Sequence, residues 1–116
     1  MSETRIIHTD DDDMSHAVRE ACALLNAGEI VALPTETVYG LGADALNPDA
    51  VAKVFAAKER PSFDPLIVHI ASRGDLKHVA IVPEDIAETV KKLTTTFWPG
   101  PLTLILPKHP DIPDLV

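Results

Sequence analysis

Short apolar runs typical of strands alternate along this chain with apolar residues at helical spacing, and this alternation restricts the fold more than any other feature. Residues 14–26 place apolar side chains on one helical face, and Gly28 follows where a helix cap belongs. Residues 30–33 show the pattern of a buried strand that stops at Pro34. Further strand-like runs lie at 65–70 and 102–106, and further helical patterns lie at 48–59 and 83–97. Strands that alternate with helices predict an α/β fold with at least some parallel pairing.

The second expected helix has recognisable ends. Asn47 has a side chain that caps helix N-termini, and Pro48 suits the first helical position because its missing N–H is not needed there. The apolar residues that follow fall on one helical face. We expect this helix to end near residues 59–61.

Charge and cysteine content narrow the class of protein. The chain has 116 residues and a net charge of −8, and residues 1–13 hold five acidic side chains against the single Arg5. We expect residues 1–13 to be an acidic, flexible tail and residues 14–116 to belong to one domain. The acidic balance argues against a generally basic nucleic-acid binder. Cys22 is the only cysteine, which excludes an internal disulfide.

The sequence indicates neither a membrane segment nor a metal centre. No apolar run approaches the roughly 18 residues that a membrane-spanning helix needs, and the acidic N-terminus lacks the order of a signal peptide. The histidines other than His69 show no ligand spacing, so a zinc site is not expected. We therefore expect a soluble, cytoplasmic protein.

Residues 33–42 form a polar, glycine-bearing turn directly after the first strand-like run. Thr35 and Thr37 can donate or accept hydrogen bonds, and the two glycines, Gly40 and Gly42, allow close approach to the backbone. Tyr39 lies inside the turn, which favours a place in the lining of a pocket. The turn is neither a Walker loop nor a dinucleotide fingerprint, so an ordinary strand-to-helix connection is the alternative.

Lys58 and Arg60 place two cations two residues apart where the second helix ends. Outside helical geometry, both side chains can turn to the same side. Arginine offers a planar fork and lysine a compact charge, a pair that suits phosphate groups. The alternative is ordinary surface charge, because cations at a helix C-terminus are stabilised by the helix dipole.

His69 lies near the end of an otherwise apolar strand-like run. A histidine there is usually a core residue whose hydrogen bonds are satisfied. The alternative is a side chain that points from the end of the strand into a cleft, where it binds a carboxylate or a hydroxyl group.

Three motifs taken together resemble the YrdC-like threonylcarbamoyl-AMP synthase family. They are residues 33–45 (LPTETVYGLGADA), Lys58-x-Arg60-Pro61 with residues 65–69 (PLIVH), and residues 97–103 (FWPGPLT). The motifs occur in the family's order and spacing, and the resemblance covers the chain from about Ala17 onward. It implies a twisted, open, mixed sheet with flanking helices.

The resemblance also implies an activity. The family's L-threonylcarbamoyladenylate synthases are nucleotidyltransferases that condense L-threonine, bicarbonate and ATP to threonylcarbamoyl-AMP and pyrophosphate, with Mg²⁺ accompanying the ATP. Their product supplies threonylcarbamoyladenosine at the position next to the anticodon of tRNA, through a downstream transferase complex. Positioned cations and hydrogen-bond donors can stabilise the charge that develops in such a reaction without a covalent nucleophile.

The resemblance assigns seven side chains to two parts of one site. The ATP-binding part consists of Lys58, Arg60 and Asp64, and the first two are also the expected catalytic residues. Two further residues face the threonine, namely Thr37 and His69. The threonine pocket is shaped by Thr35 and Tyr39.

The chain departs from the family pattern in two ways. The family completes its Lys-x-Arg with a later Ser-x-Asn motif that does not occur here, so we expect a truncated, N-terminal part of the domain. Asp64 also stands where many relatives have a neutral residue, and an acid near phosphates weakens binding unless magnesium bridges it. One alternative is an inactive or regulatory module that binds double-stranded RNA or tRNA. Another is a domain of a carbamoyl-transferring maturation enzyme.

Overall fold

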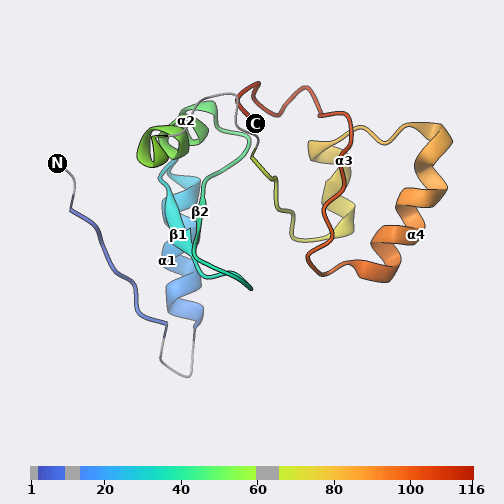
Figure 1. Cartoon of the computed structure of the whole chain (residues 1–116). Coiled ribbons are helices and arrows are strands. Elements are labelled where there is room, and N and C mark those ends of the chain that lie inside the picture. Colours follow the sequence, from blue (N-terminus) through green and yellow to red (C-terminus); the bar gives the residue numbers. More distant parts are fainter. Residues whose placement is uncertain (1–2, 10–13, 60–65) are drawn as a thin grey trace. The chain divides into compact units, whose positions relative to one another are not determined.

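The computed structural model describes residues 3–9, 14–59 and 66–116, and the chain divides into two compact units, Met1–Ser62 and Phe63–Val116. The first unit contains α1 (Ser15–Asn26), β1 (Val31–Leu33), β2 (Gly40–Gly42) and α2 (Pro48–Lys58). The second unit contains the 3-10 turns η1 (Arg73–Asp75) and η2 (Glu84–Ile86) and the helices α3 (Leu76–Val79) and α4 (Ala87–Phe97) (Figure 1). The presence of helices together with a small sheet confirms the α/β class.

In the first unit, α1 lies beside an antiparallel hairpin made of β1 and β2 (Figure 1). The helix ends as its sequence predicts, because Gly28 directly after the cap adopts a positive φ of 84° that favours glycine. The hairpin pairs Val31 with Gly42 and Leu33 with Gly40. The strand β2 was not expected, because the sequence Gly-Leu-Gly lacks the β-branched residues that mark strands.

The helix α2 begins and ends as predicted and supplies the buried residues of the first unit. The Asn47 Oδ1 atom accepts hydrogen bonds from the backbone N–H groups of Asp49 at 3.1 Å and Ala50 at 3.3 Å. Pro48 is the first helical residue. The helix buries four apolar side chains, namely Ala50, Val51, Val54 and Phe55. A local cap and one apolar face therefore define this helix.

Replacing Asn47 by alanine is expected to lower the free energy of unfolding of the first unit by about 1 kcal/mol, because two backbone N–H groups of α2 lose their acceptor. Urea unfolding followed by circular dichroism measures the change. Asn26→Ala is the matched control, since this exposed asparagine ends α1 and makes no side-chain hydrogen bond among the described residues. Equal losses in the two variants would contradict the capping role.

In the second unit, a short antiparallel contact joins the end of α3 to the C-terminal segment. Ala80 and Lys108 form an isolated bridge, flanked by hydrogen bonds from Ile81 N to Pro107 O at 2.8 Å and from His109 N to Val79 O at 3.0 Å. The helix expected at 83–97 is confirmed as η2 followed by α4. The η1 turn and α3 were not predicted, since this four-residue helix is too short for a periodic apolar pattern.

Three expectations about strands are wrong for the described residues. Residues 66–70 and 102–106 form no strand. The strands β1 and β2 pair antiparallel, so the described residues contain no parallel strand pair. The run at 30–33 is not buried either, because Leu33 is 37% exposed. An extended segment becomes a strand only when its backbone N–H and C=O groups form hydrogen bonds with a neighbouring segment. No described segment pairs with residues 66–70 or 102–106 in this way.

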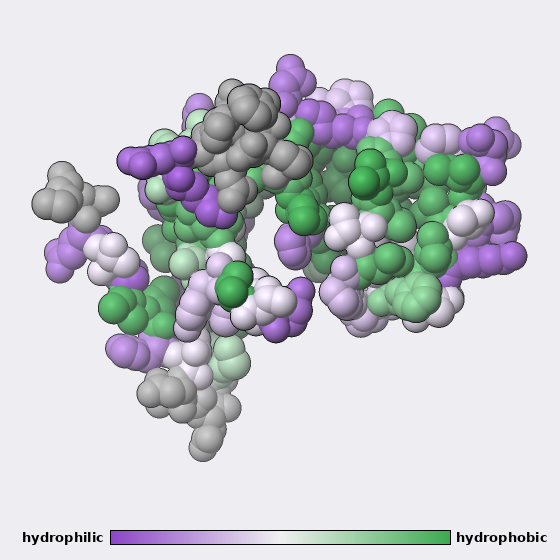
Figure 2. Space-filling view, in the orientation of Figure 1, coloured by the Kyte–Doolittle hydropathy of each residue, from purple (hydrophilic) through white to green (hydrophobic). Residues whose placement is uncertain are grey.

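The two unpaired segments nevertheless keep the side-chain alternation of strands. Exposure alternates residue by residue along both, with Ile67 65% exposed and Ile105 97% exposed. Figure 2 shows apolar side chains at the surface of the second unit. The alternation of apolar residues therefore predicts an extended backbone. Strand pairing and burial depend instead on other segments of the chain.

The N-terminal residues have one defined contact. Residues 3–9 form no helix or strand, and the Arg5 guanidinium pairs with the Glu20 carboxylate of α1 at 2.6 Å. Residues 1–2 and 10–13 of the expected acidic tail lie outside the described residues. Within the part of the chain that the structure describes, no helix is long and apolar enough to cross a membrane.

Candidate functional site

The polar turn singled out in the sequence connects β1 to β2 and stands open to solvent. All residues from Pro34 to Tyr39 are exposed, and the Tyr39 side chain is 77% exposed. The turn therefore brings Thr35, Thr37 and Tyr39 together on one short loop. It joins two strands, so the alternative of a strand-to-helix connection is wrong.

The hydroxyl group of Thr35 organises this turn. Its oxygen accepts hydrogen bonds from the backbone N–H of Thr37 at 3.3 Å and of Val38 at 3.2 Å, and its proton is donated to the Val38 carbonyl oxygen. The Thr37 Oγ1 atom lies 3.5 Å from the Thr35 Oγ1 atom. A side chain that bonds to backbone groups two and three residues ahead is a common way to close a turn.

Two glycines allow the strands beside the turn to pack closely. A Cβ atom built on Gly40 would lie 3.4 Å from the Thr35 Cγ2 atom, and one on Gly42 would lie 3.3 Å from the Leu33 Cδ1 atom. The space that a side chain would need is therefore taken by β1 and the turn. Glycine serves the hairpin itself here, in addition to the expected access for a ligand.

Lys58 is the last residue of α2 and is exposed. Glu59 directly after it adopts the left-handed conformation, with φ 52° and ψ 37°, so the chain leaves helical geometry at the point expected from the sequence. Among the described residues, none forms a hydrogen bond or ion pair with the Lys58 side chain, which leaves its ammonium group available to an anion. Arg60 and Asp64, the other two expected ATP contacts, lie outside the described residues.

His69 belongs to the second unit and is exposed, so it is not a buried core residue there. Its Nδ1 atom lies 3.2 Å from the Ile67 carbonyl oxygen. Because a carbonyl oxygen only accepts, this contact requires a proton on Nδ1. In the neutral ring Nε2 is then an acceptor, which can receive a hydrogen bond from an ammonium or hydroxyl group of a ligand.

The structure therefore gathers three of the expected residues and places two others separately. Thr35, Thr37 and Tyr39 share the turn, Lys58 lies at the end of α2 in the same unit, and His69 lies in the second unit. Among the described residues, no group of three histidine, cysteine, aspartate or glutamate side chains lies close enough to hold a metal ion. The first unit offers hydroxyl groups and a cation, and the second unit offers the imidazole of His69.

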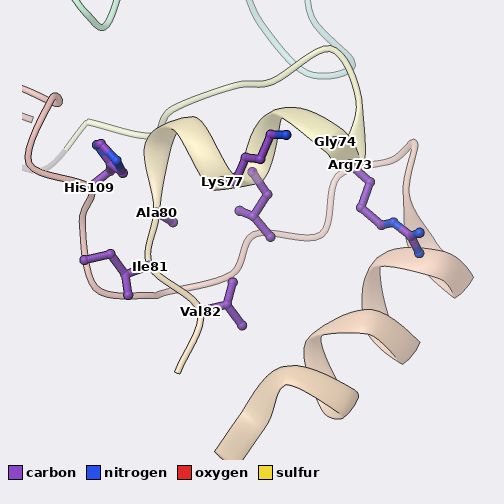
Figure 3. Close-up of a pocket in the computed structure, with 8 residues that line it drawn as sticks. Arg73, Gly74, Lys77, Ala80, Ile81, Val82 and His109 are labelled. Atoms are coloured by element: carbon purple, nitrogen blue, oxygen red, sulfur yellow. The ribbon is translucent and has the colours of Figure 1, made fainter. Parts of the chain in front are cut away.

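The second unit also has an open depression of about 510 Å³ that the sequence did not indicate. Figure 3 shows Arg73 and His109 at opposite sides of it, with Arg73 directed toward α4, where Nη1 donates to the Thr95 hydroxyl at 2.5 Å. The floor is apolar and includes Ala80, Ile81 and Val82. The Arg73 and His109 side chains point apart (Figure 3), so the depression does not form a convergent anion site.

Comparisons with known proteins agree with the motifs. The profile of the Sua5/YciO/YrdC family, described as "Telomere recombination", matches residues 23–116. A threonylcarbamoyl-AMP synthase of Bacillus subtilis is 54% identical over 94 residues, which cover 81% of this chain and 26% of that protein. A threonylcarbamoyl-AMP synthase of Pyrococcus abyssi is 48% identical over 99 residues, which cover 85% of this chain and 28% of that protein.

Solved structures give the same relationship. The structure of Pyrococcus abyssi Sua5 in complex with L-threonine superposes with a TM-score of 0.77 at 48% identity, over 84% of this chain and 28% of that chain. A doubly substituted Sua5 from the same organism superposes equally well, with a TM-score of 0.77. This chain thus spans little more than a quarter of the length of these relatives. The profile match and the shared fold establish that it belongs to the Sua5/YciO/YrdC family.

Proposed function

We propose that this chain contributes the threonine-binding turn and the phosphate-binding lysine of an L-threonylcarbamoyladenylate synthase. The observation that carries the proposal is the identity of 48–54% to two proteins named threonylcarbamoyl-AMP synthase, over a region that includes the turn and Lys58. A relative of the same fold forms a complex with L-threonine, which supports threonine as the amino-acid substrate.

On the threonine side, the proposal assigns Thr37 and His69 to the ligand. Each carries an exposed polar atom suited to an ammonium or hydroxyl group, namely the Thr37 hydroxyl and the His69 Nε2 atom. Tyr39 adds an exposed aromatic ring next to the turn. Each of these groups suits a small amino acid that offers several N–H and O–H donors.

On the nucleotide side, the proposal assigns Lys58, Arg60 and Asp64 to ATP, with Mg²⁺ bound to the ATP phosphates. The threonine amine adds to carbon dioxide from bicarbonate and gives a carbamate, and one carbamate oxygen attacks the α-phosphorus. The new P–O bond forms as the bond to pyrophosphate breaks, so negative charge moves onto the leaving group. The ammonium group of Lys58 stabilises that charge.

The first test is threonine-dependent release of pyrophosphate. We expect release when the chain is given MgATP, bicarbonate and L-threonine, and much less when L-valine replaces L-threonine, because valine has the same shape without the hydroxyl group. The Bacillus subtilis relative serves as the positive control. Release by the relative but none by this chain contradicts the expectation that the 116 residues catalyse the reaction by themselves.

A second measurement addresses the alternative of an RNA-binding module. Binding of double-stranded RNA or tRNA that weakens steeply with salt, without any pyrophosphate release, would favour that alternative. The net charge of −8 weighs against it. For the enzyme, we propose that the product passes in the cytoplasm to a downstream transferase complex that modifies tRNA.

A further inference from the structure

The hydroxyl groups of Thr35 and Thr37 differ in how much of their hydrogen-bonding capacity the turn already uses. A hydroxyl group has one proton to donate and two lone pairs that accept. The Thr35 hydroxyl uses all three within the turn, through Thr37 N, Val38 N and the Val38 carbonyl oxygen. It therefore has no capacity left for a ligand unless the turn opens.

The Thr37 hydroxyl is in the opposite situation. Among the described residues its only recorded neighbour is the Thr35 hydroxyl at 3.5 Å, which is long for an O–H···O hydrogen bond. Because the Thr35 proton goes to the Val38 carbonyl and both Thr35 lone pairs accept from backbone N–H groups, no capacity remains there for a bond with the Thr37 hydroxyl. The Thr37 oxygen then keeps its acceptor capacity for a donor outside the turn.

The backbone of Thr37 is itself held by Thr35. Its N–H group donates to the Thr35 oxygen at 3.3 Å, and the next residue is tied twice to the same hydroxyl. The Thr35 methyl group lies next to Gly40 at the start of β2. The Thr35 side chain thus connects the position of Thr37 to the start of β2.

We propose that Thr35 is a positioning residue: its hydroxyl closes the turn at 35–38 and so holds the Thr37 hydroxyl toward L-threonine, without touching L-threonine itself. This inference rests on the proposed function, because it assigns a role within the same threonine pocket. It specifies how Thr35 shapes the pocket, namely through the position of Thr37.

The variants Thr35→Val and Thr35→Ser separate the hydroxyl group from the methyl group. Valine keeps the shape beside Gly40 and removes the hydroxyl, whereas serine keeps the hydroxyl and removes the methyl. Thr37→Val removes the proposed ligand contact alone. Thr96→Val is the control, since this exposed threonine of α4 has no recorded side-chain hydrogen bond among the described residues.

The first readout is the exchange of the Thr37 and Val38 amide protons with water, measured by NMR on the 116-residue chain without ligand. Thr35→Val is expected to speed this exchange roughly fivefold, because both N–H groups lose their acceptor. Thr35→Ser is expected to leave it within about twofold of the wild type. Unchanged exchange in Thr35→Val would show that the hydroxyl does not close the turn.

The second readout is the affinity for L-threonine, measured by titration calorimetry. We expect losses of about fivefold in Thr35→Val and about tenfold in Thr37→Val, and full rescue in Thr35→Ser. The double variant Thr35→Val with Thr37→Val is expected to lose only about tenfold, because both changes remove the same contact. A loss near fiftyfold, the product of independent effects, would mean that Thr35 binds the ligand directly and would overturn the inference.

The two proposals can fail separately. A wild-type chain that does not bind L-threonine overturns the proposed function, and with it the ligand part of this inference, while amide exchange still decides whether Thr35 closes the turn. A wild-type chain that binds L-threonine, together with a Thr35→Val variant that binds equally well, overturns the positioning role alone.

Discussion

The Lys58→Ala variant is expected to bind MgATP and to release pyrophosphate at least about tenfold less well than the wild type, a loss of roughly 1.4 kcal/mol. Lys58 ends α2, is exposed and has no recorded partner among the described residues, so its charge is available for the ATP phosphates. The motif implies the same loss for Arg60→Ala. Calorimetric titration with MgATP and the pyrophosphate assay measure both effects.

The stability of the fold should hardly change in this variant. A lysine in the last turn of a helix contributes about 0.3–1 kcal/mol through the helix dipole, and alanine recovers part of this through its helix propensity. Lys92→Ala on α4 is the matched control, because Lys92 is exposed and has no recorded partner among the described residues. Lys58→Arg tests whether charge alone suffices. Wild-type activity and affinity in both Lys58→Ala and Arg60→Ala would rule out the phosphate clamp.

The Phe55→Ala variant is expected to lose about 3 kcal/mol of the free energy of unfolding of the first unit. Phe55 is 7% exposed and lies on the buried face of α2 with Val51 and Val54. Removing its ring takes away a large part of a small core and leaves a cavity that its neighbours fill only in part. Since small domains are stable by only about 5–15 kcal/mol, this loss is a large fraction of the total.

Urea unfolding followed by circular dichroism measures this loss, with Phe97→Ala as the matched control. Phe97 is 55% exposed at the end of α4, so the same substitution removes little buried surface there. We expect the control to lose less than about 1 kcal/mol. Similar losses in the two variants would mean that Phe55 does not lie in a packed core.

The helices were predictable because their signals are local. The Asn47 cap and Pro48 at the first helical position mark the start of α2, and they act on backbone groups within one turn of the chain. Gly28 marks the end of α1 for the same reason. The motifs that carry the family relationship are also short, so order and spacing along the chain were enough to indicate it.

The polar turn was predictable from its residue types, but the hydrogen bonds of its two threonines were not. By residue type alone, the hydroxyl groups of Thr35 and Thr37 have the same hydrogen-bonding capacity. The folded turn makes them different, because it saturates one hydroxyl and leaves the other open. Hydrogen-bond partners depend on the path of the backbone, which residue types alone do not specify.

Local sequence was thus sufficient for α1, α2 and α4, for the polar turn and for the family. Contacts between segments determine the strand pairing. Residues 40–42 form the strand β2 because they pair with β1, although the sequence Gly-Leu-Gly has little strand propensity. Residues 66–70 and 102–106 have the alternation of strands, yet no described neighbour pairs with them. The physical reason is that helix hydrogen bonds close within four residues, whereas a strand needs a partner that the chain must bring from elsewhere.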